Sequence, residues 1–169
     1  MVKIGEFVKV KDVECLVLDI INENPFVIAL DTKIESCFND KNSNYSNSIL
    51  EKTVNDWFEK LDVSAITRTI DLTTMDGSKC YGTLKTKVAP LTFDEWRKYA
   101  EIIIPNIKNW FWLVTVWADP KWDNWCKNTV CVVGTGGTAY LSPYGTSNGL
   151  APAFILDKAY FIQQEEKND

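Results

Sequence analysis

Five of the seven tryptophans lie within sixteen consecutive residues. They are Trp110, Trp112, Trp117, Trp122 and Trp125. An indole offers a large contact area at a small cost in side-chain entropy, and tryptophan dominates many binding interfaces. Three of these indoles fall in or beside the polar loop 118–127, where all three are costly to bury. The stretch therefore predicts an aromatic surface that binds a protein or a glycan. The alternative is a loop that folds back, so that its rings cover a small sheet.

The expected ligand-binding residues come from this loop and from a second polar, aromatic loop near Gly145. They are Trp117, Asp119, Trp122, Asp123, Asn124, Trp125, Tyr144 and Asn148. Loops that mix tyrosine, serine and asparagine make adaptable contact surfaces. For the second loop, a surface loop without function is the alternative. Trp110 and Trp112 are expected in the core, because they alternate along a strand-like run and share one face.

Catalytic constellations are not visible in the chain. There is no histidine, which excludes Ser–His and Cys–His nucleophile pairs and histidine-containing zinc sites. The run Gly134–Gly137 has neither the lysine of a phosphate-binding loop nor a helix after it, and predicts a hairpin turn. Nothing in the spacing pairs Asp31 with Glu35, or Asp56 with Glu59, as acid and base. We expect no enzyme, no catalytic residues and no cofactor.

Metal and disulfide chemistry are also not expected. Asp119, Asp123 and Asn124 offer three oxygen ligands, whereas Ca²⁺ takes six to eight. The five cysteines include no C-x-x-C pair. Cys126 and Cys131 are the pair that a hairpin would bring together, but reduced thiols are the expectation in a chain without a recognisable leader.

The charge balance excludes a nucleic-acid binder with a broad basic surface. The formal net charge is −5, and the excess of acid lies entirely in the first half of the chain. The apolar runs are far shorter than the ~20 residues that a membrane helix needs. We therefore expect an intracellular protein, or one released by lysis, without direct contacts to nucleic acid or membrane. The oligomeric state is left open.

The order of elements indicates one α+β domain over residues 1–162, followed by a polar tail over 163–169. Residues 7–30 alternate in a manner typical of an antiparallel meander. Two helices are expected, and each begins with a capping box, Ser48 with Glu51 and Thr92 with Glu95. Residues 64–88 are expected to form a hairpin or a long ordered loop.

The later half changes to strand-like patterns. The expected strands cover 110–117, 129–133 and 138–141, and a closing strand over 149–156 is entered through a bend at Pro152. With the two helices, these strands predict helices packed on a twisted antiparallel sheet.

Four short motifs in this order resemble an uncharacterised domain family of bacterial and phage genomes whose members end in Gly-Val-Arg-Pro-Ala. The motifs are Ser48 to Phe58 on the first helix, Leu91–Trp96, Trp112–Thr115 and Gly149–Leu156. That family is similar to C-type-lectin-like domains, which include relatives of the formylglycine-generating enzyme and retroelement-diversified receptor-binding proteins. The resemblance implies a C-type-lectin-like fold and a location in the bacterial host cytoplasm or on a virion. No catalytic residue is carried over.

The chain departs from the family at three arginine positions, which here hold Glu51, Val114 and Ala151. Either a buried polar network has been replaced by apolar packing, or a site has been lost. The leading hypothesis is a non-enzymatic recognition module, such as a phage accessory or receptor-binding protein. The alternative is a small acidic phage inhibitor of a host nucleic-acid-binding defence protein, whose basic channel would attract the acidic residues 12–62.

Overall fold

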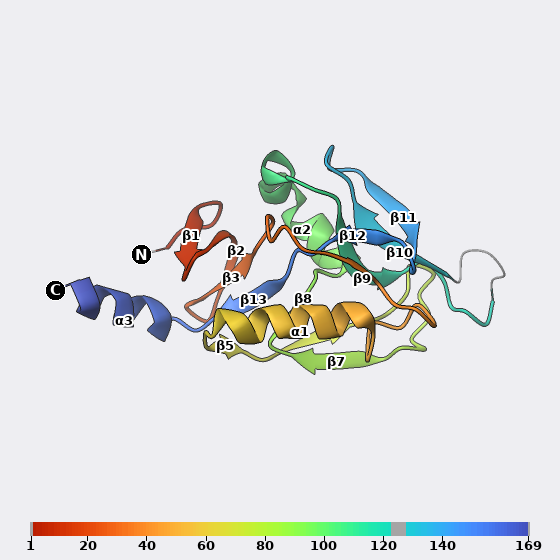
Figure 1. Ribbon diagram of the computed structural model, residues 1–169, viewed down its shortest axis with the longest axis horizontal. Helices are drawn as coiled ribbons and strands as arrows, with labels where there is room; N and C mark the ends of the chain where they lie inside the picture. The colour runs from red at the N-terminus through yellow and green to blue at the C-terminus, as the bar shows by residue number, and fades with distance from the viewer. Residues whose placement is uncertain (1, 123–127, 169) are drawn as a thin grey trace.

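A computed structural model describes residues 2–122 and 128–168, with side chains to residue 164. Its first sheet begins with the expected meander of β1 (Phe7–Val10), β2 (Val13–Ile21) and β3 (Asn24–Ile28). Next to β3 lies β13 (Ala153–Leu156) from the far end of the chain, and β13 also pairs with β5 (Ala65–Ile66) and β8 (Val88–Ala89). The chain's two ends are therefore joined through this sheet (Figure 1).

The second sheet has the order β11-β10-β9-β12-β4. Its strands are β9 (Phe111–Val116), β10 (Thr129–Val133), β11 (Ala139–Pro143), β12 (Ser147–Gly149) and β4 (Glu35–Cys37). The expected closing strand is thus split, because β12 and β13 belong to different sheets on either side of Pro152. Gly149 is required at its position, since a Cβ there would lie 2.3 Å from the carbonyl oxygen of Trp110.

A separate hairpin connects the two helical parts of the chain. Its strands are β6 (Arg68–Asp71) and β7 (Thr83–Thr86), which pair in antiparallel fashion. Gly77, in the turn between them, has a φ of +86°, a conformation that glycine adopts without strain. The hairpin expected over residues 64–88 is confirmed.

Both expected helices are present with their caps. The side chain of Ser48 accepts the N–H of Glu51 at the start of α1 (Ile49–Leu61), and Thr92 accepts the N–H of Glu95 at the start of α2 (Phe93–Ile103). A 3₁₀ turn, η1 (Ile104–Asn106), follows α2 and contains Pro105. Pro105 therefore ends the regular helix as predicted.

A third helix, α3 (Ala159–Asn168), replaces most of the expected polar tail. The carboxylate of Asp157 accepts the N–H of Ala159 at its start, and the hydroxyl of Tyr160 accepts the N–H of Lys11. The tail has the composition of a frayed end, but Asp157 supplies a local signal for a helix start. The polar segment expected over 163–169 therefore continues a helix for most of its length.

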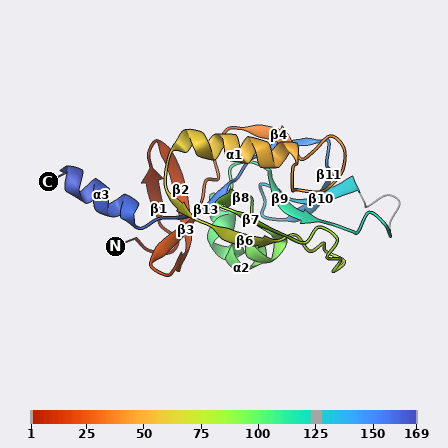
Figure 2. The ribbon, with the colours of Figure 1, turned by 90° about the horizontal axis from the view of Figure 1, so that it is seen from below.

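The two main helices lie on opposite sides of the strands (Figure 2). On one side, Val54 and Phe58 of α1 pack in a cluster with Trp112 and Val114 of β9. On the other side, α2 packs in a cluster with Leu113 of β9. The fold is therefore α+β, with helices covering both faces of the strand layer, and all six residues of β9 are buried.

Candidate functional site

The tryptophans of residues 110–122 separate into three environments around β9. Trp112 is fully buried, and its indole N–H donates to the carbonyl of Ser36 across 2.7 Å. Trp110 precedes the strand and Trp117 follows it, and both are exposed, as is Trp122. Trp125 lies outside the described residues. The expectation that Trp110 is in the core was wrong, because β9 begins one residue later, at Phe111.

The loop after β9 presents the most exposed indole. Trp122 is 77% exposed, while Trp117 is 39% exposed. The N–H of Trp122 donates to the carbonyl of Asp119 across 3.0 Å, which closes a turn. The ammonium of Lys121 lies 5.7 Å from the centre of the Trp122 ring, within the range of a cation–π contact. The indole therefore faces solvent from a hydrogen-bonded turn.

Asp119 was predicted to contact a ligand, but its carboxylate is occupied by the protein itself. The residue is 3% exposed. Its Oδ2 accepts from the Ser78 hydroxyl across 2.6 Å, and its Oδ1 accepts from the N–H of Lys121 across 2.8 Å. The hydrogen bond from Ser78, and then that from Lys121, lower the pKa of Asp119. Asp119 therefore anchors the loop through these two hydrogen bonds.

The turn 74–78 of the β6–β7 hairpin supports the same loop. Backbone N–H groups of Met75 and Asp76 donate to the carbonyls of Val116 and Trp117. In return, the N–H of Asp119 donates to the carboxylate of Asp76 across 3.2 Å. The exit from β9 is thereby fixed on one side by a segment about forty residues away in sequence.

The second predicted loop reaches the same end of the second sheet. The N–H of Tyr144 donates to the carbonyl of Asn128. The next residue, Thr129, accepts the N–H of Trp117 at its own carbonyl. Tyr144 is half-buried, and its hydroxyl donates to the carbonyl of Lys41 across 3.5 Å. The amide of Asn148 donates to Ser142 across 3.1 Å. Tyr144 therefore lies near Trp117, while its hydroxyl and the Asn148 amide already have partners within the protein.

The remaining predicted site residues, Asp123 and Asn124, lie outside the described residues, as does Cys126. Within residues 2–122 and 128–168 no group of three or more possible metal ligands comes together. Asp119, the third oxygen donor proposed for calcium, is engaged as described above. The described cysteines Cys15, Cys37, Cys80 and Cys131 are free thiols.

A second aromatic surface, which sequence reasoning missed, lies at the opposite end of β9. The rings of Trp110 and Tyr140 contact each other, with centroids 4.8 Å apart, and both are nearly half exposed. The turn 134–137 lies against them, since a Cβ on Gly134 would meet both rings and one on Gly137 would meet Ile104. The sequence signal for this surface was the glycine-rich turn 134–137 beside β11, because glycines leave room for bulky neighbouring side chains.

Comparisons with protein-family models, with curated proteins and with solved structures each found no match for this chain. The resemblance expected from its four short motifs therefore stays a prediction. In the part of the chain that the structure describes, no helix is long and apolar enough to cross a membrane.

Proposed function

We propose that this protein is a non-enzymatic recognition module that binds a protein or a glycan through exposed indoles at the end of β9. The observation that carries the proposal is the 77% exposure of Trp122 on a turn fixed by Asp119. Exposing so large an apolar side chain forfeits about 2 kcal/mol of burial, and the hydrogen-bonded turn limits the backbone entropy lost when a ligand covers the ring. Trp117 and Tyr144, near the same end of the second sheet, are the further residues that we assign to the contact surface.

The arrangement of the elements supports a C-type-lectin-like fold as part of this proposal. Helices α1 and α2 cover opposite faces of the strands, and β3 and β13 join distant parts of the chain. Val114 and Ala151, at two of the family's arginine positions, are 1% exposed within the two core clusters. Apolar packing therefore occupies these positions. A phage accessory or receptor-binding role fits a rigid layer that presents loops.

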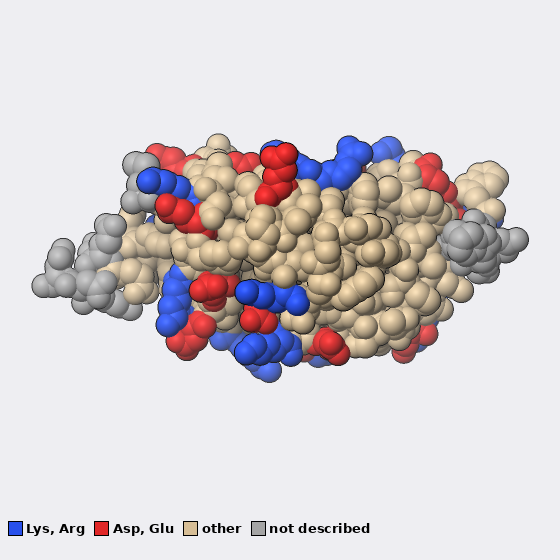
Figure 3. Space-filling view, turned by 90° about the horizontal axis from the view of Figure 1, so that it is seen from above, with Lys and Arg blue, Asp and Glu red and all other residues tan. Residues whose placement is uncertain are grey.

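The acidic-inhibitor alternative has less support from the charge distribution. Four carboxylates of residues 12–62 form ion pairs with lysines. They are Asp19, Glu23, Asp56 and Asp62. Figure 3 shows acidic and basic side chains interspersed over one face of the molecule. Such pairing weakens the field that would steer the chain towards a basic channel.

The proposal is tested with Trp122→Ala and Trp122→Phe, and with Trp110→Ala as a control at the other end of β9. Each labelled protein is applied to an array of bacterial surface saccharides, and purified proteins captured from bacterial lysate are titrated against each variant. We expect Trp122→Ala to weaken binding by about 30-fold, equivalent to about 2 kcal/mol, and Trp122→Phe to retain part of it. Equal binding by the wild type and Trp122→Ala, with unchanged circular dichroism, would contradict the proposal.

A further inference from the structure

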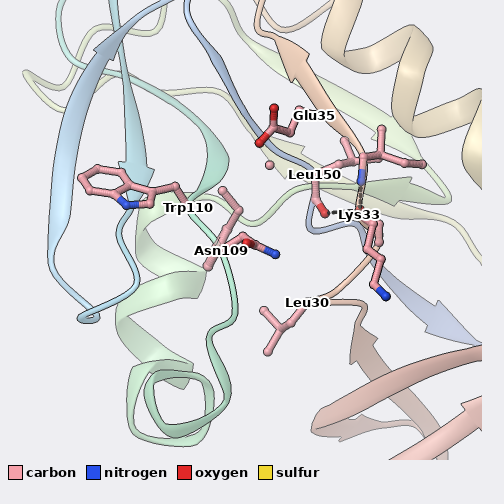
Figure 4. A pocket seen from close by; sticks show the side chains of 10 residues that line it. Leu30, Lys33, Glu35, Asn109, Trp110 and Leu150 are labelled. Carbon is pink, nitrogen blue, oxygen red and sulfur yellow. Dashed lines mark hydrogen bonds between the residues drawn. The ribbon is translucent and has the colours of Figure 1, made fainter.

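A hollow of about 350 Å³ lies away from the Trp122 loop, between the segments before β4 and β9 and the link from β12 to β13 (Figure 4). Side chains of contrasting chemistry line it. They include Leu30, Lys33, Glu35, Asn109, Phe111 and Leu150. The indole of Trp110 points away from the hollow, so the hollow and the Trp110–Tyr140 surface are separate features.

Two hydrogen bonds to Leu150 hold the segment 32–34, which carries Lys33 and forms one wall of the hollow. The Thr32 hydroxyl donates to the carbonyl of Leu150 across 2.8 Å, and the N–H of Leu150 donates to the carbonyl of Ile34 across 2.9 Å. Between these contacts Lys33 has a φ of +58°, in the left-handed region. Non-glycine residues in this region are strained and cluster at functional sites. Lys33 is one of six non-glycine residues with a positive φ in the described part of the chain, and the contacts on either side of it hold this conformation in place.

The charges of the hollow have no partners within the described protein. Lys33 and Glu35 are exposed, and neither forms an ion pair with any residue in 2–122 or 128–168. In Figure 4 the ammonium of Lys33 and the carboxylate of Glu35 lie towards opposite ends of the hollow. The amide of Asn109 is directed into the space between them. An amide both donates and accepts hydrogen bonds.

We propose that this hollow binds a small zwitterion whose charges lie at opposite ends, specifically a dipeptide with free termini. The ligand's ammonium lies at Glu35 and its carboxylate at Lys33, while the Asn109 amide pairs with the peptide group. Leu30, Leu150 and Phe111 form the floor of the hollow and are largely covered by the protein, so they offer a ligand side chain only a small apolar contact. A ligand that is only an anion would be repelled by Glu35, and a ligand that is only a cation would be repelled by Lys33. The volume is at the lower end of the range for small-molecule sites, which favours a dipeptide over a longer peptide.

The test is calorimetric titration of the full chain with L-leucyl-L-leucine, its N-acetyl form and its C-terminal amide. We expect saturable binding of the unblocked dipeptide, and about tenfold weaker binding of each blocked form, because each loses one charged hydrogen bond. The variant Glu35→Gln should bind the unblocked and N-acetyl forms equally. Lys33→Gln should bind the unblocked and amidated forms equally.

The exposed residues Lys41 and Glu59 provide matched controls, because neither lines the hollow. Lys41→Gln and Glu59→Gln carry the same charge changes and should leave dipeptide binding unaltered. Absence of saturable binding up to about 10 mM, where even a weak site is half filled, would overturn the proposal. Equal binding of blocked and unblocked forms by the wild type would also overturn it. Neither result bears on the Trp122 surface.

Discussion

The hydroxyl of Ser78 donates to Oδ2 of Asp119 across 2.6 Å, and this contact joins the β6–β7 hairpin to the loop that presents Trp122. Asp119 also holds the N–H of Lys121, one residue before Trp122. The carboxylate therefore acts as a junction between two loops that are remote in sequence. The position of the turn that carries the exposed Trp122 indole therefore depends on the two hydrogen bonds of Asp119.

Replacing the two partners of this junction tests their coupling. We expect Asp119→Ala and Ser78→Ala each to lower the urea midpoint of unfolding, because each removes the Ser78–Asp119 hydrogen bond, one of the contacts between the hairpin turn and the loop. The double variant should lose less than the sum of the single variants, since their shared hydrogen bond is removed only once. Additive losses in urea titrations followed by circular dichroism would contradict this coupling.

Acid should weaken the same region. The pKa values of Asp71, Asp76 and Asp119 are lowered, in each case chiefly by a neighbouring hydroxyl, those of Thr73, Thr74 and Ser78 respectively. A lowered folded-state pKa contributes stability above the unfolded value of about 3.9, and this stability is lost as the pH falls through the folded-state pKa. Urea midpoints should therefore decrease from about pH 5 to about pH 2. Asp119→Ala should show a smaller decrease, and a parallel pH profile would contradict the assignment.

Substitution of Trp112 should destabilise the protein far more than substitution of Trp122. Trp112→Phe leaves a cavity in the core and removes the donor to Ser36, so we expect a loss of about 2–3 kcal/mol in the free energy of unfolding. Trp122→Ala changes a side chain that is 77% exposed and should alter stability by less than about 0.5 kcal/mol. Urea unfolding of both variants checks the contrast, which similar losses would contradict.

Local signals in the sequence were sufficient to predict the two main helices, the N-terminal meander and the hairpin after the first helix. Ser48 and Thr92 each satisfy a free backbone N–H at a helix start, and this chemistry is readable within four residues. The meander and the β6–β7 hairpin follow from alternation and turn residues in the same way. The start of α3 was missed because composition was weighed above the capping capacity of Asp157.

The candidate site was only partly predictable, because burial depends on partners that are distant in sequence. Asp119 has the residue type of a ligand contact, yet Ser78, forty-one residues away, engages it. Trp110 continues the apolar pattern of β9 but lies outside the strand. The hollow near Lys33 combines segments around residues 30–35, 109–111 and 149–150, and no local pattern joins segments so far apart.

The burial of β9 on both faces has a further consequence for the two aromatic surfaces. The backbones of Trp110 and Trp117 are separated by one extended strand, which places their Cα atoms about 23 Å apart. Because α1 and α2 enclose that strand, the spacing cannot shorten without loss of the native core. A single compact ligand therefore cannot bridge both indoles, and simultaneous occupancy requires either two independent molecules or one elongated molecule that runs along the length of β9.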